Sequence, residues 1–169
     1  MMPLPAALGG KGLVAWRLDM SLHAATWDSG EGAFLEGGRW NSRGTRAVYC
    51  AIDPATAILE VAVHKGFDAL DTVAHVLTAV EIADPRAVHI VQPDDVPNPN
   101  WLRSGQPSAG QQKFGDALLA KHKFVVIPSV VSVHSWNVIF LGAATSNAYA
   151  LRSQERFALD TRLNPPKKS

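Results

Sequence analysis

The sequence predicts an α+β fold: a single compact domain with a mixed, strand-rich sheet and a few helices. Its 169 residues are typical of one domain, and no internal repeat, low-complexity block or long linker divides them. Most apolar segments are short runs of strand length, and only two segments carry helix signals. Hydrophobic residues make up 47% of the chain and charged residues 18%, a balance typical of soluble globular proteins.

The first two predicted strands are separated by a long polar stretch. Residues 13–18 and 47–51 are apolar and are predicted to be strands, whereas residues 21–46 are rich in glycine and polar side chains and are predicted to be mostly loop. The glycine pair at 37–38 allows a sharp backbone turn directly before Arg39. Further strands are predicted at residues 73–82, 88–91, 124–127, 130–133 and 138–141.

Two helices are predicted between these strands. Asp53 can cap the first helix, Pro54 fits its first position, and Gly66 can close it, which places this helix at residues 55–65. The second helix is predicted at residues 111–121. Three of its side chains are expected to face inward: Phe114, Leu118 and Leu119.

The first helix carries one narrow polar stripe on an otherwise apolar surface. Thr56, Glu60 and His64 are spaced by four residues and therefore share a face of the helix. Such a helix is buried on most sides, so its polar stripe faces either water or a cleft. From the residues alone, both alternatives remain open for Glu60.

The ends of the chain and its charge limit the possible functions. Residues 1–12 are predicted to be a flexible N-terminus and residues 164–169 a flexible tail, which leaves 13–163 as the domain. The formal net charge of +1 gives no reason to expect direct nucleic-acid binding. The chain begins without a secretion signal and has no apolar run of about 18 residues, so we expect a cytoplasmic protein without membrane contact. The single cysteine, Cys50, excludes an intrachain disulfide and is predicted to be a small core residue.

The common catalytic and metal-binding motifs are absent from the sequence. There is no phosphate-binding loop of the Gly-x-x-x-x-Gly-Lys-Ser/Thr type, no Gly-x-Ser-x-Gly elbow and no His-Glu-x-x-His motif. The six histidines are not spaced as metal ligands, so we expect no metal site.

Four residues of different chemistry remain as candidates for a site. Arg39 is presented from a tight turn, Tyr49 lies in a predicted strand, Glu60 lies on the polar stripe, and Ser129 interrupts an apolar strand after a proline. A cation, an aromatic ring, a carboxylate and a hydroxyl suit a charged aromatic nucleotide, because arginine can grip a phosphate and tyrosine can pack on a flat ring. Each of these residues, taken alone, more often has a structural role than a functional one. Their spacing alone does not show that they form a functional site.

The order of several short blocks resembles the RES-domain family from about residue 13 to residue 163. Two of these blocks are fairly specific when taken together: Gly-Arg-Trp-Asn, followed by Leu-Glu-Val twenty residues later. The family is named after an arginine, a glutamate and a serine, which here look like Arg39, Glu60 and Ser129. The matching blocks are Trp16-Arg17, Gly38-Arg39-Trp40-Asn41, Gly44-Thr45, Val48-Tyr49-Cys50-Ala51, Ala57-Ile58-Leu59-Glu60-Val61, Phe114-Gly115-Asp116 and Ile127-Pro128-Ser129.

The resemblance implies a fold similar to that of ADP-ribosyltransferase toxins and a substrate, NAD, that is consumed without a metal. The expected activity is that of a bacterial toxin that cleaves the nicotinamide–ribose bond by hydrolysis or phosphorolysis. A protein ADP-ribosyltransferase that uses the same pocket is the alternative. The expected partner is an Xre-like helix-turn-helix antitoxin that covers the active site and forms an oligomer with the toxin.

The resemblance also implies a role for each candidate residue. Glu60 is expected to stabilise the sugar cation that forms when nicotinamide leaves. Arg39 is expected to hold phosphate or ribose oxygens, Tyr49 to pack on the nicotinamide or its ribose, and Ser129 to hydrogen-bond the substrate. Two further residues are candidates for substrate binding: Arg17 and Asn137.

The sequence departs from the family pattern after Asn137. The family often continues toward an Asn-Pro-x-His segment, whereas residues 138–144 here read Val-Ile-Phe-Leu-Gly-Ala-Ala. A third alternative therefore remains: a non-catalytic interaction module that retains the RES fold.

Overall fold

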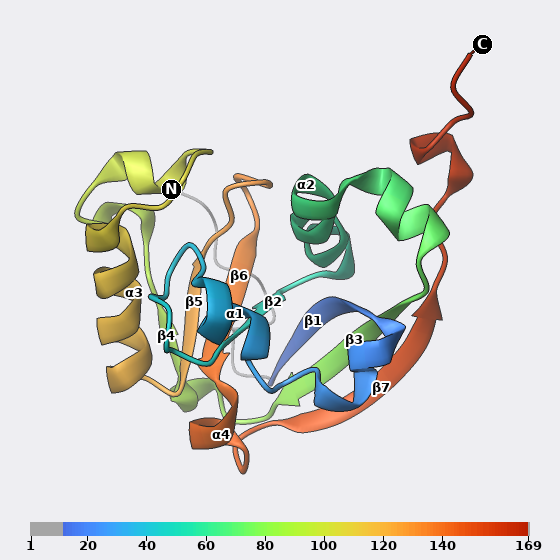
Figure 1. The fold of residues 1–169 in the computed structure, drawn as a ribbon. Coiled ribbons are helices and arrows are strands. Elements are labelled where there is room, and N and C mark those ends of the chain that lie inside the picture. The colour runs from blue at the N-terminus through green and yellow to red at the C-terminus, as the bar shows by residue number, and fades with distance from the viewer. Residues whose placement is uncertain (1–11, 169) are drawn as a thin grey trace.

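A computed structural model describes residues 12–168, and a seven-stranded mixed sheet runs through it (Figure 1). In spatial order the strands are β4 (Val88–Ile90), β5 (Phe124–Pro128), β6 (Trp136–Leu141), β2 (Ala47–Ala51), β1 (Leu13–Met20), β3 (His75–Ile82) and β7 (Ala150–Phe157). Neighbouring strands are antiparallel except β4 and β5, which are parallel. The predicted α+β class with a single mixed sheet is confirmed. Residues 1–11 of the predicted flexible N-terminus lie outside the described residues.

The helices lie over different ends of the sheet (Figure 1). α3 packs on β5 and β6, α2 packs on β1 and β2, and α1 contacts β2. Short 3-10 turns connect several elements, among them those at Ser21–Thr26 and Pro99–Leu102. The helices of the described residues are α1 (Glu31–Glu36), α2 (Pro54–Thr72), α3 (Ala109–Lys121) and α4 (Gly142–Thr145).

The apolar alternation of the strands divides the core between the two faces of the sheet. On β5, Phe124 and Val126 belong to one buried cluster, whereas Val125 and Ile127 belong to a second cluster together with side chains of α3. A third cluster lies under α2 and includes residues of β1 and β3. Cys50 is buried in the first cluster, as predicted, and burial raises the pKa of its thiol to about 12. Its thiol is therefore a packing group rather than a nucleophile.

The sheet is weakly joined between β1 and β2. Trp16 and Ala51 form the only register pair between these two fully described strands, whereas β1 pairs with β3 along its whole length. Beyond that pair the two strands separate, and backbone groups of β2 lose a ladder partner on this side. Such groups need another partner when they are buried. This opening positions the cleft described below.

The predicted strand at residues 130–133 is wrong, because this segment is a turn. Ser129 N–H donates to the Ser135 carbonyl, Ser135 N–H to the Ser132 carbonyl, and Ser132 N–H to the Ser129 hydroxyl. Serine groups that bond the nearby backbone compete with a strand ladder. The chain therefore folds back from β5 to β6 here.

Several regular elements were not predicted from the sequence. The stretch 21–46, expected to be mostly loop, contains α1 and a 3-10 turn. α4 follows β6 directly. β7 was missed because nearly all of its side chains are exposed and most of them are polar, so it has no apolar alternation.

The first predicted helix is present but longer than expected. Asp53 caps α2 by accepting from Thr56 N–H, and Pro54 occupies the first turn, as predicted. Gly66 closes the first helical segment, as predicted, because its φ of 80° and ψ of 158° are not helical. A second helical segment follows this kink and extends α2 to Thr72. The second predicted helix corresponds to α3, where Leu119 is buried and Phe114 and Leu118 pack partly buried beside it.

Candidate active site

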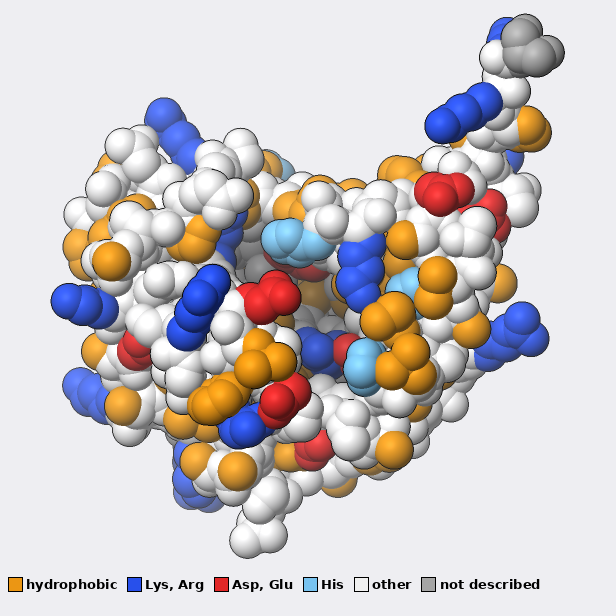
Figure 2. Space-filling view, viewed as in Figure 1, with side chains coloured by type: hydrophobic (Ala, Val, Ile, Leu, Met, Phe, Trp, Pro, Cys, Tyr) orange, Lys and Arg blue, Asp and Glu red, His pale blue; other side chains and the backbone are white. Residues whose placement is uncertain are grey.

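A deep cleft opens beside the weakly joined strands β1 and β2. Its volume is about 1240 Å³, which exceeds the range of about 300–1,000 Å³ typical of small-molecule pockets. β1, β2, α1, α2 and the loop before Trp40 contribute to its walls. Figure 2 shows this face hollowed, with basic, acidic and histidine side chains around the hollow. Five of the six candidate residues line the cleft: Arg17, Arg39, Tyr49, Glu60 and Asn137.

Glu60 is held in the cleft through one of its two carboxylate oxygens. Its Oε1 accepts hydrogen bonds from Ser129 Oγ at 3.0 Å and from Asn137 Nδ2 at 2.7 Å. No hydrogen bond from a described residue reaches Oε2. The carboxylate is therefore oriented by two donors and retains one oxygen for a ligand.

Ser129 is brought to Glu60 but does not line the cleft. It is 3% exposed, its Oγ donates to Glu60, and the same Oγ accepts from Ser132 N–H. A hydroxyl has only one proton to donate, so that proton is already used. In this geometry the Ser129 hydroxyl orients Glu60, and its proton is not free for the substrate hydrogen bond expected from the sequence.

Asn137 also acts on Glu60, through its amide group. Nδ2 donates to Glu60 Oε1, while Oδ1 is buried without a hydrogen-bond partner among the described residues. The segment in which the sequence departs from the family pattern begins at the next residue. None of residues 138–144 lines the cleft.

Tyr49 offers its ring to the cleft, whereas its hydroxyl is committed elsewhere. The hydroxyl donates to Asn41 Oδ1 at 2.7 Å and accepts from Trp40 N–H at 3.0 Å. Burial raises the pKa of Tyr49, so this hydroxyl stays protonated. Only glycine fits at position 38, because a Cβ there would lie 2.6 Å from the Tyr49 hydroxyl oxygen.

Arg39 lines the cleft, but part of its guanidinium group donates hydrogen bonds to three backbone carbonyls. Nη1 donates to the carbonyls of Trp101 at 3.5 Å and Arg103 at 3.2 Å, and Nη2 donates to that of Gly105 at 3.1 Å. No carboxylate of the described residues forms a salt bridge with it. Its positive charge is therefore uncompensated within this part of the chain.

Arg17 fills the gap left by the separation of β1 and β2. Its Nη1 donates to the Tyr49 carbonyl at 2.8 Å, which replaces a missing ladder bond. Asp19 pairs with the same guanidinium through both carboxylate oxygens, each at 2.9 Å. Asp19 therefore offsets the positive charge of Arg17, whereas no carboxylate of the described residues offsets that of Arg39.

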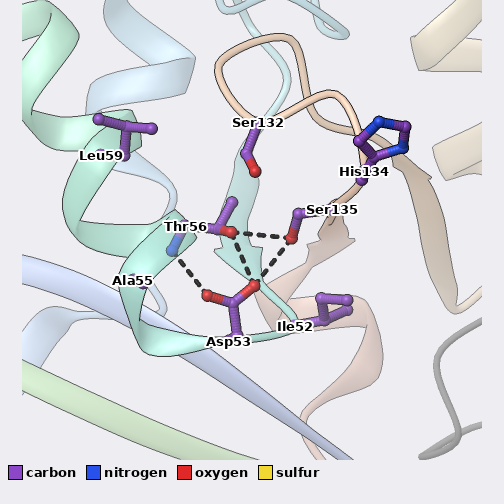
Figure 3. Close-up of a pocket in the computed structure, with 8 residues that line it drawn as sticks. All are labelled: Ile52, Asp53, Ala55, Thr56, Leu59, Ser132, His134 and Ser135. Carbon is purple, nitrogen blue, oxygen red and sulfur yellow. Dashed lines mark hydrogen bonds between the residues drawn. The ribbon is translucent and has the colours of Figure 1, made fainter.

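A buried polar cluster holds the start of α2 against the start of β6 (Figure 3). Asp53 Oδ2 accepts from Thr56 Oγ1 at 2.7 Å and from Ser135 Oγ at 2.8 Å. Burial alone would raise the pKa of Asp53, but its bonds from Thr56 and Ser135 outweigh burial and lower that pKa. His134 is turned away from the cluster in Figure 3, so these groups do not form a Ser-His-Asp triad.

This cluster stabilises the arrangement of Glu60 and Asn137, because it joins the elements that carry them. Ser135→Ala removes the hydroxyl that links Asp53 and Thr56. We expect a loss of about 1–2 kcal/mol in the free energy of unfolding, or about 3–6 °C in Tm for a chain of this size. Calorimetry measures this loss, and Ser104→Ala in an exposed loop is the control. An equal Tm for both variants would contradict a structural role for the cluster.

Thr56 belongs to this cluster and not to the cleft. It is 3% exposed, whereas Glu60 is half-buried and His64 is exposed, and the last two line the cleft. The predicted polar stripe therefore faces inward at its first position and a cleft at the other two.

Two positioning residues were not recognised from the sequence. Asn41 is fully buried and holds the loop that presents Arg39, and Asp116 of α3 accepts from Ser42 N–H at 3.1 Å to dock the same loop. Both lie in blocks shared with the RES family. Asp116 acts on a residue 74 positions away, so the local pattern gave no signal for it. Asn41 bonds residues one to eight positions away, within a stretch that was predicted to be mostly loop.

The sequence matches the RES domain over residues 14–161, which is most of the chain. The chain belongs to the RES-domain family. Arg39, Glu60 and Ser129, the residues expected to correspond to the family's name, all lie in or beside the cleft of this RES domain.

Two curated relatives of this RES domain carry the name toxin Res. The protein from Photorhabdus laumondii is 32% identical over 160 residues, covering 92% of this chain and 100% of the relative. The protein from Yersinia enterocolitica is 30% identical over 155 residues, covering 89% of this chain and 99% of the relative.

A solved structure shares the fold of this RES domain. The crystal structure of the M. tuberculosis MbcT–MbcA toxin–antitoxin complex matches with a TM-score of 0.63 at 19% sequence identity. The match covers 87% of this chain and 85% of the solved chain. At this identity the likeness supports the fold alone.

Residues 12–168 contain no group of three or more His, Cys, Asp or Glu side chains placed to hold a metal ion. No helix among them is long and apolar enough to cross a membrane.

Proposed function

We propose that this RES protein is the toxin of a toxin–antitoxin pair and cleaves the nicotinamide–ribose bond of NAD. The observation that carries the proposal is the state of Glu60: one carboxylate oxygen is fixed by Ser129 and Asn137, and the other has no bond from a described residue. An oriented carboxylate in a large cleft, beside an aromatic ring and an uncompensated arginine, suits a positively charged nucleotide.

The chemistry needs little beyond this carboxylate. Nicotinamide in NAD is a positively charged leaving group, so it departs with the electron pair of the C1′–N bond and needs no proton. The ribose becomes oxocarbenium-like, and Glu60 Oε2 stabilises that positive charge electrostatically. A nucleophile then attacks C1′, and its proton passes to Glu60 or to solvent. This is glycosidic cleavage with a leaving group that is already activated.

The remaining cleft residues bind the other parts of the substrate. Arg39 uses three of its five N–H groups for backbone carbonyls, so two remain for a phosphate or ribose oxygen. The ring of Tyr49 packs on nicotinamide or its ribose. Arg17 contributes a weaker anion contact because Asp19 neutralises it.

The acceptor of the ADP-ribose group is water, phosphate or a protein. Incubation with NAD in the presence and absence of phosphate, followed by chromatography, separates hydrolysis from phosphorolysis. NAD labelled in its adenylate part shows transfer to protein. We propose a small-molecule acceptor, so release of nicotinamide without labelled protein supports the proposal, and stoichiometric protein labelling would favour the ADP-ribosyltransferase.

Expression in bacteria is expected to arrest growth and to lower cellular NAD, because the cell cannot replace NAD as fast as it is cleaved. Glu60→Gln is expected to be tolerated with NAD unchanged. Asp68→Asn, which makes the same chemical change at an exposed position of α2, is expected to remain toxic. Growth curves and NAD assays measure both effects. Equal arrest by all three proteins at constant NAD would contradict the mechanism.

The open cleft also needs an inhibitor in the host, and we propose an antitoxin of the Xre-like helix-turn-helix type that covers it. Leu35 lines the cleft and is 59% exposed, an apolar contact for such a partner. The solved structural neighbour is itself a toxin–antitoxin complex. Co-purification with a small helical protein that blocks nicotinamide release supports this proposal. A tight partner that leaves nicotinamide release unchanged would contradict it.

A further inference from the structure

Residues 103–107 form part of the cleft wall but have few ties to the rest of the protein. Gly105, Gln106 and Pro107 line the cleft, while residues 103–106 are exposed to solvent. The segment connects the 3-10 turn at Pro99–Leu102 to α3. Only its two ends are anchored by secondary structure.

The anchoring on both sides of the segment is clear. Before it, the ring of Trp101 packs on Phe114, and the Trp101 carbonyl accepts from Gln111 Nε2 at 3.2 Å. After it, Ser108 caps α3 by accepting from Gln111 N–H. Between these anchors, the bond from Arg39 to the Gly105 carbonyl is the only hydrogen bond that any described residue makes to residues 104–106.

We infer that Arg39 is a positioning residue that holds residues 103–107 in place as one wall of the cleft. Its planar guanidinium spans the carbonyls of Trp101, Arg103 and Gly105 at 3.1–3.5 Å. These three hydrogen bonds join the loop before Trp40 to the loop before α3, so they set the width of the cleft between the two loops. This role goes beyond charge and beyond the proposed grip on a phosphate.

Arginine is required for this role because lysine has a different donor geometry. A guanidinium offers five N–H groups in a rigid plane, whereas an ammonium offers three donors from a single atom. Arg39→Lys therefore keeps the positive charge in the cleft but loses the span across three carbonyls. This one substitution therefore distinguishes the effect of the charge of Arg39 from the effect of its three hydrogen bonds.

The test uses trypsin, because the exposed Arg103–Ser104 bond lies within the segment. Cleavage of this bond in the native protein without substrate is followed by mass spectrometry. We expect Arg39→Lys and Arg39→Met to be cleaved there about tenfold faster than the wild type, because loss of the bonds raises the open population of the segment. Arg86→Lys, at an exposed salt bridge outside the cleft, should be cleaved at the wild-type rate.

The kinetics provide a second readout. Arg39→Lys is expected to raise the KM for NAD about tenfold and to change kcat much less, because the wall binds substrate and Glu60 is intact. Unchanged cleavage at Arg103–Ser104 in both Arg39 variants would overturn the inference. That result is independent of NAD, so it is distinguishable from a failure of the proposed function.

Discussion

Replacing Glu60 with glutamine is expected to lower the NAD turnover rate by about 100-fold to 1,000-fold, the loss typical of removing one electrostatic contact to a transition state. The fold should be nearly unaffected. A glutamine oxygen can take the place of Oε1 and still accept from Ser129 and Asn137, while its amide replaces the free Oε2. The melting temperature should therefore stay close to that of the wild type.

The control for this experiment is Asp68→Asn on the same helix. Asp68 is exposed and does not line the cleft, so the loss of its charge should leave turnover unchanged. The free energy of unfolding should change by less than about 0.5 kcal/mol, which leaves Tm nearly the same. Thr56→Ala, one turn before Glu60, is unsuitable as a control because Thr56 is buried in the Asp53 cluster. If Glu60→Gln keeps most of the wild-type turnover, Glu60 is not the catalytic carboxylate.

Asn41→Ala is expected to destabilise the protein by about 3–4 kcal/mol, because it removes the several hydrogen bonds of a buried amide group and leaves the Tyr49 hydroxyl without its acceptor. Asn41 is fully buried, and its Nδ2 donates to the carbonyls of Ala33, Ser42 and Thr45 at 3.0–3.2 Å. Its Oδ1 accepts the hydroxyl of Tyr49. The expected decrease in Tm is about 10 °C.

Asn147→Ala makes the same chemical change at an exposed position and should alter the free energy of unfolding by less than about 0.5 kcal/mol. Denaturant unfolding of both variants measures the difference. A loss of activity in Asn41→Ala below its melting temperature is also expected, since the loop that presents Arg39 loses its support. A Tm for Asn41→Ala equal to that of Asn147→Ala would show that the loop is held by other contacts.

The sequence predicted the elements whose patterns are local. The apolar runs that became β1, β2, β5 and β6 were recognised, as were the Asp53-Pro54 start of α2 and the position of α3. β7 could not be recognised because an exposed edge strand needs no apolar side chains. The apolar residues at 130–133 led to the wrong prediction of a strand, because the serines around them form hydrogen bonds with the backbone of a turn.

The candidate site was predictable in its members but not in its contacts. The family resemblance pointed to Arg39, Tyr49 and Glu60, which all line one cleft. The bond from Ser129 to Glu60 joins positions 69 residues apart, and Arg39 reaches carbonyls 62–66 residues further along the chain. Contacts of this kind follow from the tertiary arrangement of β5, β6 and α2, which no local pattern encodes.

The most direct test of the central claim is free nicotinamide released from NAD by the purified protein without any bound partner. We expect nicotinamide to accumulate in proportion to the NAD lost, and Glu60→Gln to release it about 100-fold to 1,000-fold more slowly. Protein that is folded by calorimetry yet releases no nicotinamide, with or without phosphate, would contradict the account.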